Sequence, residues 1–480
     1  MSYDSKTAGN GALSVAQLRA AVTGRVITPE DSDYDQARTV FYGGIDRRPI
    51  AIVRAADAND VARVVSLARE TGIELAVRGG GHSASGHGVT EGGVVLDLSP
   101  MKSLDFDLEH RTVWAGAGVT AGEYTTAAAA HGLATGFGDT GSVGIGGITL
   151  GGGIGYLARK YGLTIDSLLA AEVVTADGKR VYTDAETNPD LFWAIRGGGG
   201  NFGVVTRLQF RLSEVPSIYG GMLILPATPE TLSAFLEAAD AAPDELTTIA
   251  NVMVAPPMPF VPPEAHGKLI IMGTLVYAGD AEAGQRVIAP FRALATPIVD
   301  MIRPMSYAEL YPPEAEGYHP VAAARTMFID HFDTAMAADL IHRLTTAKAM
   351  MAVSQIRVLG GAVSRIPADS TAYAHRNRRL MVNVAALYNN PAERPTHDAW
   401  AADFAAALQQ GTTGAYVNFL GPDGTSRIRE AYPGDVWERL RAVKAKYDPT
   451  NLFHLNQNIP PAGDSSRQPE PDRASTGETR

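Results

Sequence analysis

The first half of the chain alternates short apolar runs with segments whose apolar residues recur at helical spacing. Residues 49–54 and 73–77 are short, mostly apolar runs typical of buried strands. Between them, Asp57 can cap a helix whose apolar positions lie three and four residues apart, at Val61, Val64, Val65 and Ala68. The pattern predicts a strand–helix–strand unit. Further along it predicts strands at 94–98 and 112–117 and a helix at 120–131, and a short helix is expected at 15–22.

After residue 214 the pattern changes, because prolines interrupt the chain and the apolar runs become longer. Strands are predicted at 221–225, 248–255, 269–277, 355–363 and 380–388. Helices are predicted at 229–242, 281–294, 334–350 and 396–410. Strands with helices between them and no glycine clusters indicate an α+β platform that would cover a ligand and shape a substrate pocket. A strand at 416–421 and a helix at 433–446 are expected near the end.

Three glycine-rich segments stand out in the first half of the chain, at residues 78–83, 136–155 and 196–203. Glycines allow backbone N–H groups to point into one concavity, and such a nest binds phosphate. Arg78 adds a positive charge beside the first segment, and His82 would lie at its mouth. Three such loops predict one large ligand contacted mainly by main chain, and a dinucleotide fits that description.

One stretch of the second segment also matches a nicotinamide-dinucleotide fingerprint. Residues 153–158 read GIGYLA, a GxGxxA pattern, and Glu172 follows about 20 residues later. A loop of that kind normally follows the first strand of its unit, whereas this one lies about 150 residues into the chain, between other glycine-rich loops. The nicotinamide interpretation is therefore the less favoured alternative.

Composition narrows the class of protein. The 480 residues carry a net charge of −11, which disfavours nucleic acid as a partner, and they include no cysteine, so disulfides and thiolate nucleophiles are impossible. No signal peptide is recognised and no apolar run has the length of a membrane span, so we expect a cytoplasmic protein that acts on a small molecule away from membranes. His331 and His342 lack the spacing of a metal-binding pair, and no metal site is expected.

Five motifs in order carry a resemblance to a known family. They are VRGGGHS from residue 77, VGxxGxxLGGGxG from 143, AEVVTADG from 171, DLFWAIRGGGGNFGVVT from 190 and YDPTNLFxxNxNI from 447. With these motifs the chain resembles the berberine-bridge-enzyme-like oxidases, which are flavin-linked oxidases with the vanillyl-alcohol-oxidase (PCMH) type of FAD domain. The resemblance implies FAD as cofactor.

The resemblance also implies an α+β fold whose FAD domain is built from both ends of the chain. A PCMH-type FAD-binding domain with two α/β subdomains is expected at residues 13–213. An inserted α+β substrate domain, an antiparallel sheet covered by helices, is expected at 214–414, and a C-terminal segment at 415–461 would complete the FAD domain. Residues 462–480 contain almost nothing apolar and are expected to be disordered.

The residues that hold FAD follow from the same resemblance. His82 matches the family histidine that bonds covalently to the flavin 8α-methyl group. Thr140 stands where many members carry a cysteine for a second bond, so attachment through His82 alone is expected. The other residues expected to bind FAD are Arg78, Gly79, Gly80, Gly81, Ser83, His87, Thr140, Gly141, Val143, Gly144, Gly147, Gly152, Gly153, Gly203, Val205, Asn456 and Asn458.

Val143 matches a family position where a small valine, in place of leucine, leaves room for dioxygen. We therefore expect an oxidase that transfers a hydride from an alcohol or activated C–H bond of a sugar or secondary metabolite to flavin N5, with O₂ reduced to H₂O₂. A flavin dehydrogenase or isomerase of the same fold, and a flavin-binding protein with little catalysis, stay open as alternatives. The protein is expected to be a monomer or a homodimer.

The catalytic base is not given by the family pattern. Phe419 and Ile154 stand where many members have tyrosines, and Asn383 stands where the plant alkaloid enzymes have a glutamate. Asn383 is therefore one candidate for catalysis, and Tyr416, Tyr156 and Tyr388 are candidates by their closeness to the motifs. For each tyrosine a packing role is at least as well supported, because strand tyrosines are often core residues with a satisfied hydroxyl.

Overall fold

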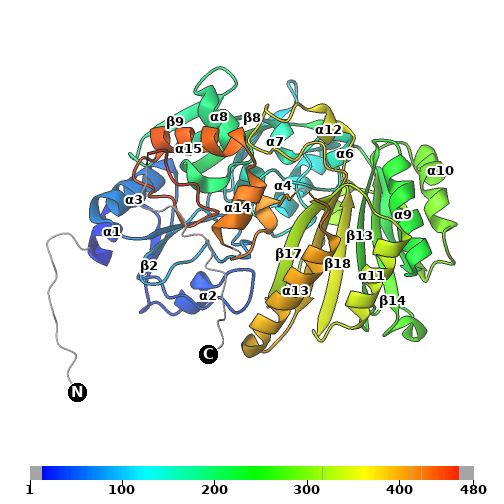
Figure 1. Ribbon diagram of the computed structural model, residues 1–480. Helices are drawn as coiled ribbons and strands as arrows, with labels where there is room; N and C mark the ends of the chain where they lie inside the picture. The colour runs from blue at the N-terminus through cyan, green and yellow to red at the C-terminus, as the bar shows by residue number, and fades with distance from the viewer. Residues whose placement is uncertain (1–12, 316, 412, 423, 464–480) are drawn as a thin grey trace, which may run out of the picture.

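The computed structural model describes residues 13–315, 317–411, 413–422 and 424–463. It combines smaller sheets built from the first half of the chain with one large sheet built from the middle, and it confirms the predicted α+β class. The last helices, α14 and α15, return to the elements of the first half (Figure 1). All of the predicted tail except Ala462 and Gly463 lies outside the described residues.

The first sheet has the strand order β1-β2-β4-β3, with β2, β4 and β3 parallel. Its strands are β1 Arg25–Ile27, β2 Ala51–Arg54, β3 Leu75–Arg78 and β4 Val94–Asp97. Helix α3 (Ala58–Thr71) joins β2 to β3; Asp57 caps it by accepting the N–H groups of Asn59 and Asp60, and Gly72 ends it at φ 69°. The predicted strand–helix–strand unit is confirmed, and the first glycine-rich loop begins where its second strand, β3, ends.

The second sheet is antiparallel, in the order β5-β6-β10-β8-β9. Its strands are β5 Leu104–Asp107, β6 Thr112–Gly116, β8 Leu168–Val174, β9 Arg180–Asp184 and β10 Val204–Arg211, and a small pair is formed by β7 Leu133–Ala134 and β11 Ser213–Glu214. The α-helices of this half and of the C-terminal part are α1 Val15–Ala21, α2 Tyr34–Arg38, α4 Ala121–Ala129, α5 Ile145–Leu150, α6 Ala158–Tyr161, α7 Thr164–Ser167, α8 Pro189–Ile195, α14 Thr425–Ala431 and α15 Asp435–Tyr447.

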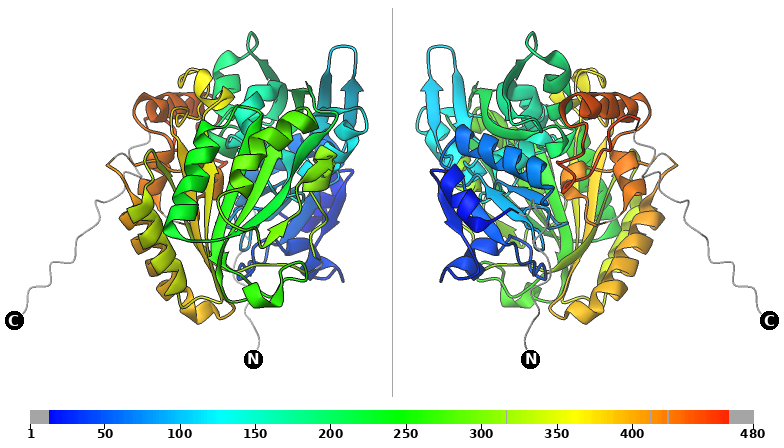
Figure 2. Two further views of the ribbon diagram at one scale, coloured as in Figure 1. Left: turned by 90° about the vertical axis from the view of Figure 1, so that its right-hand side faces the viewer. Right: turned by 90° about the vertical axis from the view of Figure 1, so that its left-hand side faces the viewer.

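The large sheet is antiparallel and has eight strands. They are β12 Ile218–Pro226, β13 Leu246–Val254, β14 Leu269–Tyr277, β15 Val299–Asp300, β16 Arg303–Met305, β17 Ala322–Ile329, β18 Met351–Val358 and β19 Leu380–Leu387. The helices of this region are α9 Pro229–Ala241, α10 Ala281–Arg292, α11 Thr334–Thr345, α12 Ala362–Arg365 and α13 Arg394–Leu408. In the left view of Figure 2 the long helices, green to orange, lie along the outside of this sheet.

Successive side chains along each strand point to opposite sides, so the large sheet has two different faces. On β19, Val382 and Val384 pack into the apolar core shared with α9, α11 and α13. Asn383 and Ala385, which point the other way, line a cavity. The long helices therefore cover one face of the sheet, and the other face forms a wall of the cavity.

Some predicted elements differ from the structure. The strand expected at 416–421 is a 3-10 turn, η5 Val417–Phe419, because the buried Tyr416 before it and Asn418 within it bond to the second glycine-rich segment instead of a neighbouring strand. The strand expected at 355–363 ends at Val358, since Gly360 and Gly361 take positive φ. Strand β17 was not predicted. In the described residues, no helix has the length and apolar character needed to cross a membrane.

Candidate functional site

A cavity of about 720 Å³ lies between the glycine-rich loops and the open face of the large sheet. Residues from all three glycine-rich segments line it, and so do strands β17, β18 and β19. Its volume is within the range of roughly 300–1,000 Å³ that is usual for ligand sites. The arrangement brings together the sequence-predicted ligand loops and the predicted platform around one space.

Glycine is required where the first two loops meet. A Cβ on Gly80 would lie 2.2 Å from the backbone N of Gly144, and a Cβ on Gly144 would lie 2.4 Å from the backbone N of Gly80. By contrast, a Cβ on Gly147 or Gly200 would meet nothing within 4 Å, and both residues line the cavity. The first pair allows backbone to pack on backbone, and the second pair keeps space free for a ligand.

Arg78 lies at the end of β3 with its side chain almost fully buried. Its Nη2 donates to the carbonyl of Ala37 at 2.7 Å and to the Asp97 carboxylate at 2.8 Å. Its Nη1 is buried without a hydrogen-bond partner among the described residues. Asp97 therefore offsets part of the positive charge that the sequence suggested, while one N–H group stays available at the wall of the cavity.

His82 lines the cavity at the first glycine-rich loop. The Phe41 ring stacks on its imidazole with centroids 4.0 Å apart and an angle of 20° between the planes. Its Nε2 lies 2.7 Å from the hydroxyl oxygen of Ser142. Burial disfavours the charged ring and lowers the pKa of His82 to about 4, although Glu314 and Ser142 oppose the shift. The imidazole is therefore neutral at pH 7.

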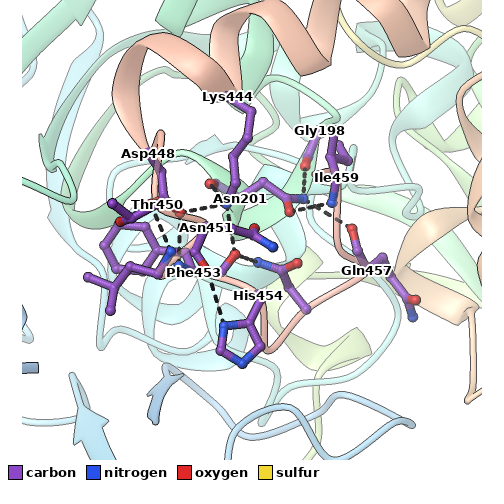
Figure 3. A network of polar contacts seen from close by, with 12 residues as sticks. Gly198, Asn201, Lys444, Asp448, Thr450, Asn451, Phe453, His454, Gln457 and Ile459 are labelled. Atoms are coloured by element: carbon purple, nitrogen blue, oxygen red, sulfur yellow. Dashed lines mark hydrogen bonds and ion pairs between the residues drawn. The ribbon is translucent and has the colours of Figure 1, made fainter. Parts of the chain in front are cut away.

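A buried network holds the C-terminal segment against the third glycine-rich loop (Figure 3). The Lys444 ammonium donates to Asp448 Oδ2 at 2.6 Å, to the Asn201 carbonyl at 2.7 Å and to the Phe453 carbonyl at 3.0 Å. Asp448 also accepts the backbone N–H groups of Leu452 and Phe453. Burial lowers the pKa of Lys444, and the Asp448 charge opposes that shift.

Asn201 links the same network to the end of the chain. Its Oδ1 accepts the N–H of Ile459 at 2.9 Å, and its Nδ2 donates to the carbonyls of Gly198 and Gln457. The segment between Phe453 and Ile459 is thereby fixed, and Asn456 and Gln457 line the cavity. The Oδ1 of Asn456 is buried without a hydrogen-bond partner among the described residues, so it can accept a hydrogen bond from a ligand.

Most residues predicted to bind FAD lie at this cavity. Those that line it are Arg78, Gly79, Gly80, Gly81, His82, Ser83, His87, Thr140, Val143, Gly144, Gly147, Gly203, Val205 and Asn456. Gly141, Gly152, Gly153 and Asn458 are not among the lining residues. Gly153 donates its N–H to the Tyr416 hydroxyl, and the Gly141 carbonyl accepts the N–H of Gly122. These two glycines therefore anchor the loop to neighbouring segments.

Two of the three candidate catalytic tyrosines, Tyr416 and Tyr156, are buried and do not line the cavity. The Tyr416 hydroxyl accepts the N–H groups of Gly153 and Ile154 at 2.9 and 3.2 Å. Tyr156 donates to the Asp139 carbonyl at 3.4 Å. Burial raises the pKa of both phenols. Each has a packing role, and catalysis by either stays a prediction.

Asn383, the third predicted catalytic residue, does line the cavity. Its Oδ1 is buried without a partner among the described residues, which leaves a hydrogen-bond acceptor for a ligand. Tyr388 also lines the cavity, but its ring stacks on His397 at 4.7 Å.

Several polar residues at the cavity were not singled out from the sequence. Asp139 and Gln355 both line it, and Gln355 Nε2 donates a hydrogen bond to Asp139 Oδ2 at 3.4 Å. Behind them the buried Arg357 donates to Asp139 at 2.7 Å and lies over the Phe419 ring. A carboxylate inside a glycine-rich segment is a signal that could have marked Asp139, whereas Gln355 and Arg357 are brought in only by the pairing of β18.

Comparisons with known proteins agree with this geometry. Residues 49–184 match a family model described as "FAD binding domain", and residues 415–460 match one described as "Berberine and berberine like". (R)-6-hydroxynicotine oxidase of Paenarthrobacter nicotinovorans is 32% identical over 92% of this chain and 98% of its own. An uncharacterised FAD-linked oxidoreductase of Bacillus subtilis is also 32% identical, over 92% of this chain and 98% of its own.

The solved structures extend the likeness to the fold. The crystal structure of 6-hydroxy-D-nicotine oxidase from Arthrobacter nicotinovorans superposes with a TM-score of 0.81 at 28% identity, covering 91% of this chain and 98% of that one. The fold and the cavity thus define an FAD-binding oxidoreductase, which confirms the expected PCMH-type architecture. The chain belongs to the berberine-bridge-enzyme-like family of FAD-linked oxidoreductases.

The residues at the cavity fit FAD. The open positions beside Gly147 and Gly200 leave room for flat rings, and the unpartnered Nη1 of Arg78 suits a phosphate oxygen. The unpartnered Oδ1 of Asn456 suits a ring N–H. Within the described part of the chain, no group of three or more His, Cys, Asp or Glu residues is arranged to hold a metal ion.

Proposed function

We propose that this protein is an oxidase that holds FAD through a single covalent bond at His82 and oxidises an alcohol or an activated C–H bond of a small organic molecule. The observation that carries the proposal is the position of His82, a neutral imidazole on the wall of the glycine-lined cavity. The absence of cysteine from the sequence excludes a second bond through sulfur. Bound FAD would supply the acceptor for the substrate hydride, with the electrons passed on to O₂ to give H₂O₂.

The chain's own residues would position the substrate. Asn383 offers an unpartnered carboxamide oxygen that can accept a hydrogen bond from a substrate O–H or N–H. The Asp139 carboxylate, held by Arg357, is one cavity group that can accept a proton as the substrate is oxidised. The face of Phe419 supplies an apolar surface for the rest of the molecule. A site of this kind suits a small molecule with one polar donor and an apolar body.

The named relative that oxidises a hydroxynicotine supports an amine-bearing aromatic substrate as one class to test. Val143 lines the cavity, which supports O₂ as the electron acceptor. Slow reoxidation of the flavin by O₂, after the substrate has reduced it, would favour a dehydrogenase instead. Failure of every alcohol and amine to bleach the flavin would favour a flavin-binding protein with little catalysis.

The attachment is tested on purified protein by intact mass and by acid precipitation. Wild-type protein should gain the mass of one FAD and give a yellow pellet. His82→Ala should give a colourless pellet while the native variant still binds FAD without a covalent bond, since the glycine loops are unchanged. His87→Ala is the matched control, because His87 also lines the cavity, and its pellet should stay yellow. A yellow His82→Ala pellet would refute the assignment.

A further inference from the structure

We propose that Ser142 and Glu314 are positioning residues that keep the imidazole proton of His82 on Nε2, so that the lone pair of Nδ1 is ready to bond to the flavin. The inference rests on the proposed function and adds two residues to it. Ser142 belongs to the second glycine-rich segment. Glu314 lies in the large-sheet half of the chain, in the segment that follows η3 (Tyr307–Leu310) and lines the cavity.

The three side chains form a continuous line of hydrogen bonds. Ser142 Oγ lies 2.6 Å from Glu314 Oε1 and 2.7 Å from His82 Nε2. An ionised carboxylate can only accept, so the hydroxyl proton of Ser142 is directed to Glu314. The hydroxyl oxygen must then accept the Nε2–H of His82. In a neutral imidazole this places the lone pair on Nδ1, because the hydrogen bond at one ring nitrogen fixes the tautomer.

The remaining surroundings of His82 leave Nδ1 available. Phe41 covers one face of the ring and fixes its plane. Nδ1 has no hydrogen-bond partner among the described residues. Because burial lowers the pKa of the ring to about 4, the neutral, nucleophilic form is the one present at neutral pH. The ring is therefore held at Nε2 and stacked on one face, and its Nδ1 has no hydrogen bond within the described part of the chain.

Attachment forms a bond between Nδ1 and the 8α carbon and breaks one C–H bond of that methyl group. The proton leaves to solvent, and the two electrons of the C–H bond enter the ring system, from which they pass with two protons to O₂ to give H₂O₂. The imidazole becomes positively charged as the bond forms. Ser142 and Glu314 stabilise that charge through the hydrogen bonds that already fix the tautomer, since bonds to charged groups are the stronger ones.

The test measures how fast FAD becomes covalently bound. Full-length protein made under riboflavin limitation is mixed with FAD, and intact mass is followed with time. Ser142→Ala should slow attachment by roughly tenfold or more, the effect of losing one hydrogen bond to a charged group. Glu314→Gln, which keeps an acceptor but removes the charge, should have a smaller effect. Ser142→Thr keeps the hydroxyl and should restore a rate close to wild type, which a purely structural role of Ser142 would not predict.

A second measurement reads the tautomer directly. In ¹⁵N-histidine-labelled wild-type protein without FAD, the His82 signals, identified by their loss in His82→Ala, should report a protonated Nε2 and a bare Nδ1. A proton on Nδ1, or a Ser142→Ala protein that attaches FAD at the wild-type rate, would overturn the inference. A wild-type protein that never gains covalent FAD would instead refute the proposed function, so the two failures are distinguishable.

Discussion

The buried Lys444 ammonium gives a direct test of how the C-terminal segment is held in place. Lys444→Met keeps a long apolar side chain and removes the charge. The Asp448 carboxylate, 0% exposed, would then keep the backbone N–H groups of Leu452 and Phe453 and a longer hydrogen bond from the Thr450 hydroxyl, but no positive charge. The carbonyls of Asn201 and Phe453 would each lose a donor. The substitution therefore leaves a buried charge without its counter-ion.

Removing one partner of a buried ion pair costs about 3–5 kcal/mol. The two backbone donors that remain on Asp448 place our expectation at the lower end, about 3 kcal/mol. A chain of 480 residues that unfolds as a unit has an unfolding entropy of about 1 kcal/mol/K, from about 2.1 cal/mol/K per residue. The melting temperature should therefore fall by about 3 °C.

Thermal unfolding of five proteins tests this reasoning: wild type, Lys444→Met, Lys446→Met, Asp448→Asn and the Lys444→Met/Asp448→Asn double variant. Lys446→Met is the matched control, because Lys446 forms a surface ion pair with Asp190 that is worth at most about 1 kcal/mol. Adding Asp448→Asn to Lys444→Met removes the unpaired charge and should recover part of the loss. The reasoning is refuted if Lys444→Met melts no lower than the control, or if the double variant is as unstable as the sum of the two single ones.

The remaining predictions concern the cavity and one buried histidine. Asn383→Leu should leave the melting temperature unchanged but lower kcat/KM by about tenfold, because a substrate donor loses its acceptor. Val143→Leu should slow reoxidation by O₂ by roughly tenfold, about 1.4 kcal/mol, in stopped-flow measurements, with reduction by substrate unaffected. Burial lowers the pKa of His375 to about 4, so the unfolded chain takes up this proton first. His375 by itself should therefore lower the free energy of unfolding by about 1.4 kcal/mol per pH unit as the pH drops from about 6.5 to 4. His375→Gln should flatten that dependence in denaturant titrations.

The sequence was sufficient for the elements whose signals are local. The helix after Asp57 has its cap, its apolar face and its terminal glycine within one short stretch, and the structure reproduces all three. Strand β17 gave no such signal, because Ala322–Ile329 contains small and charged residues that become a strand only by pairing with β19. Tertiary pairing decides such a segment, and its propensity does not.

The residues of the site also fall into those that local motifs reveal and those that only the fold brings together. His82 and the glycine-rich loops could be located from motifs, since close backbone approach demands glycine at particular positions. Ser142 and Glu314 are 172 residues apart and meet only after folding, so their hydrogen bond has no local trace in the sequence. Tyr416 looked chemically suitable, yet its hydroxyl is used by the backbone of the glycine-rich segment. The sequence alone does not show which hydroxyl groups form hydrogen bonds within the fold and which face a ligand.

The distance along the chain between the two sides of the cavity has a consequence for biosynthesis. His82 leaves the ribosome long before Asn456 and Gln457, which complete the lining. At 5–20 residues per second this delay is roughly 20–75 s. A nascent chain therefore presents an incomplete pocket for most of its synthesis, and we expect cofactor loading to follow the synthesis of residues 456 and 457.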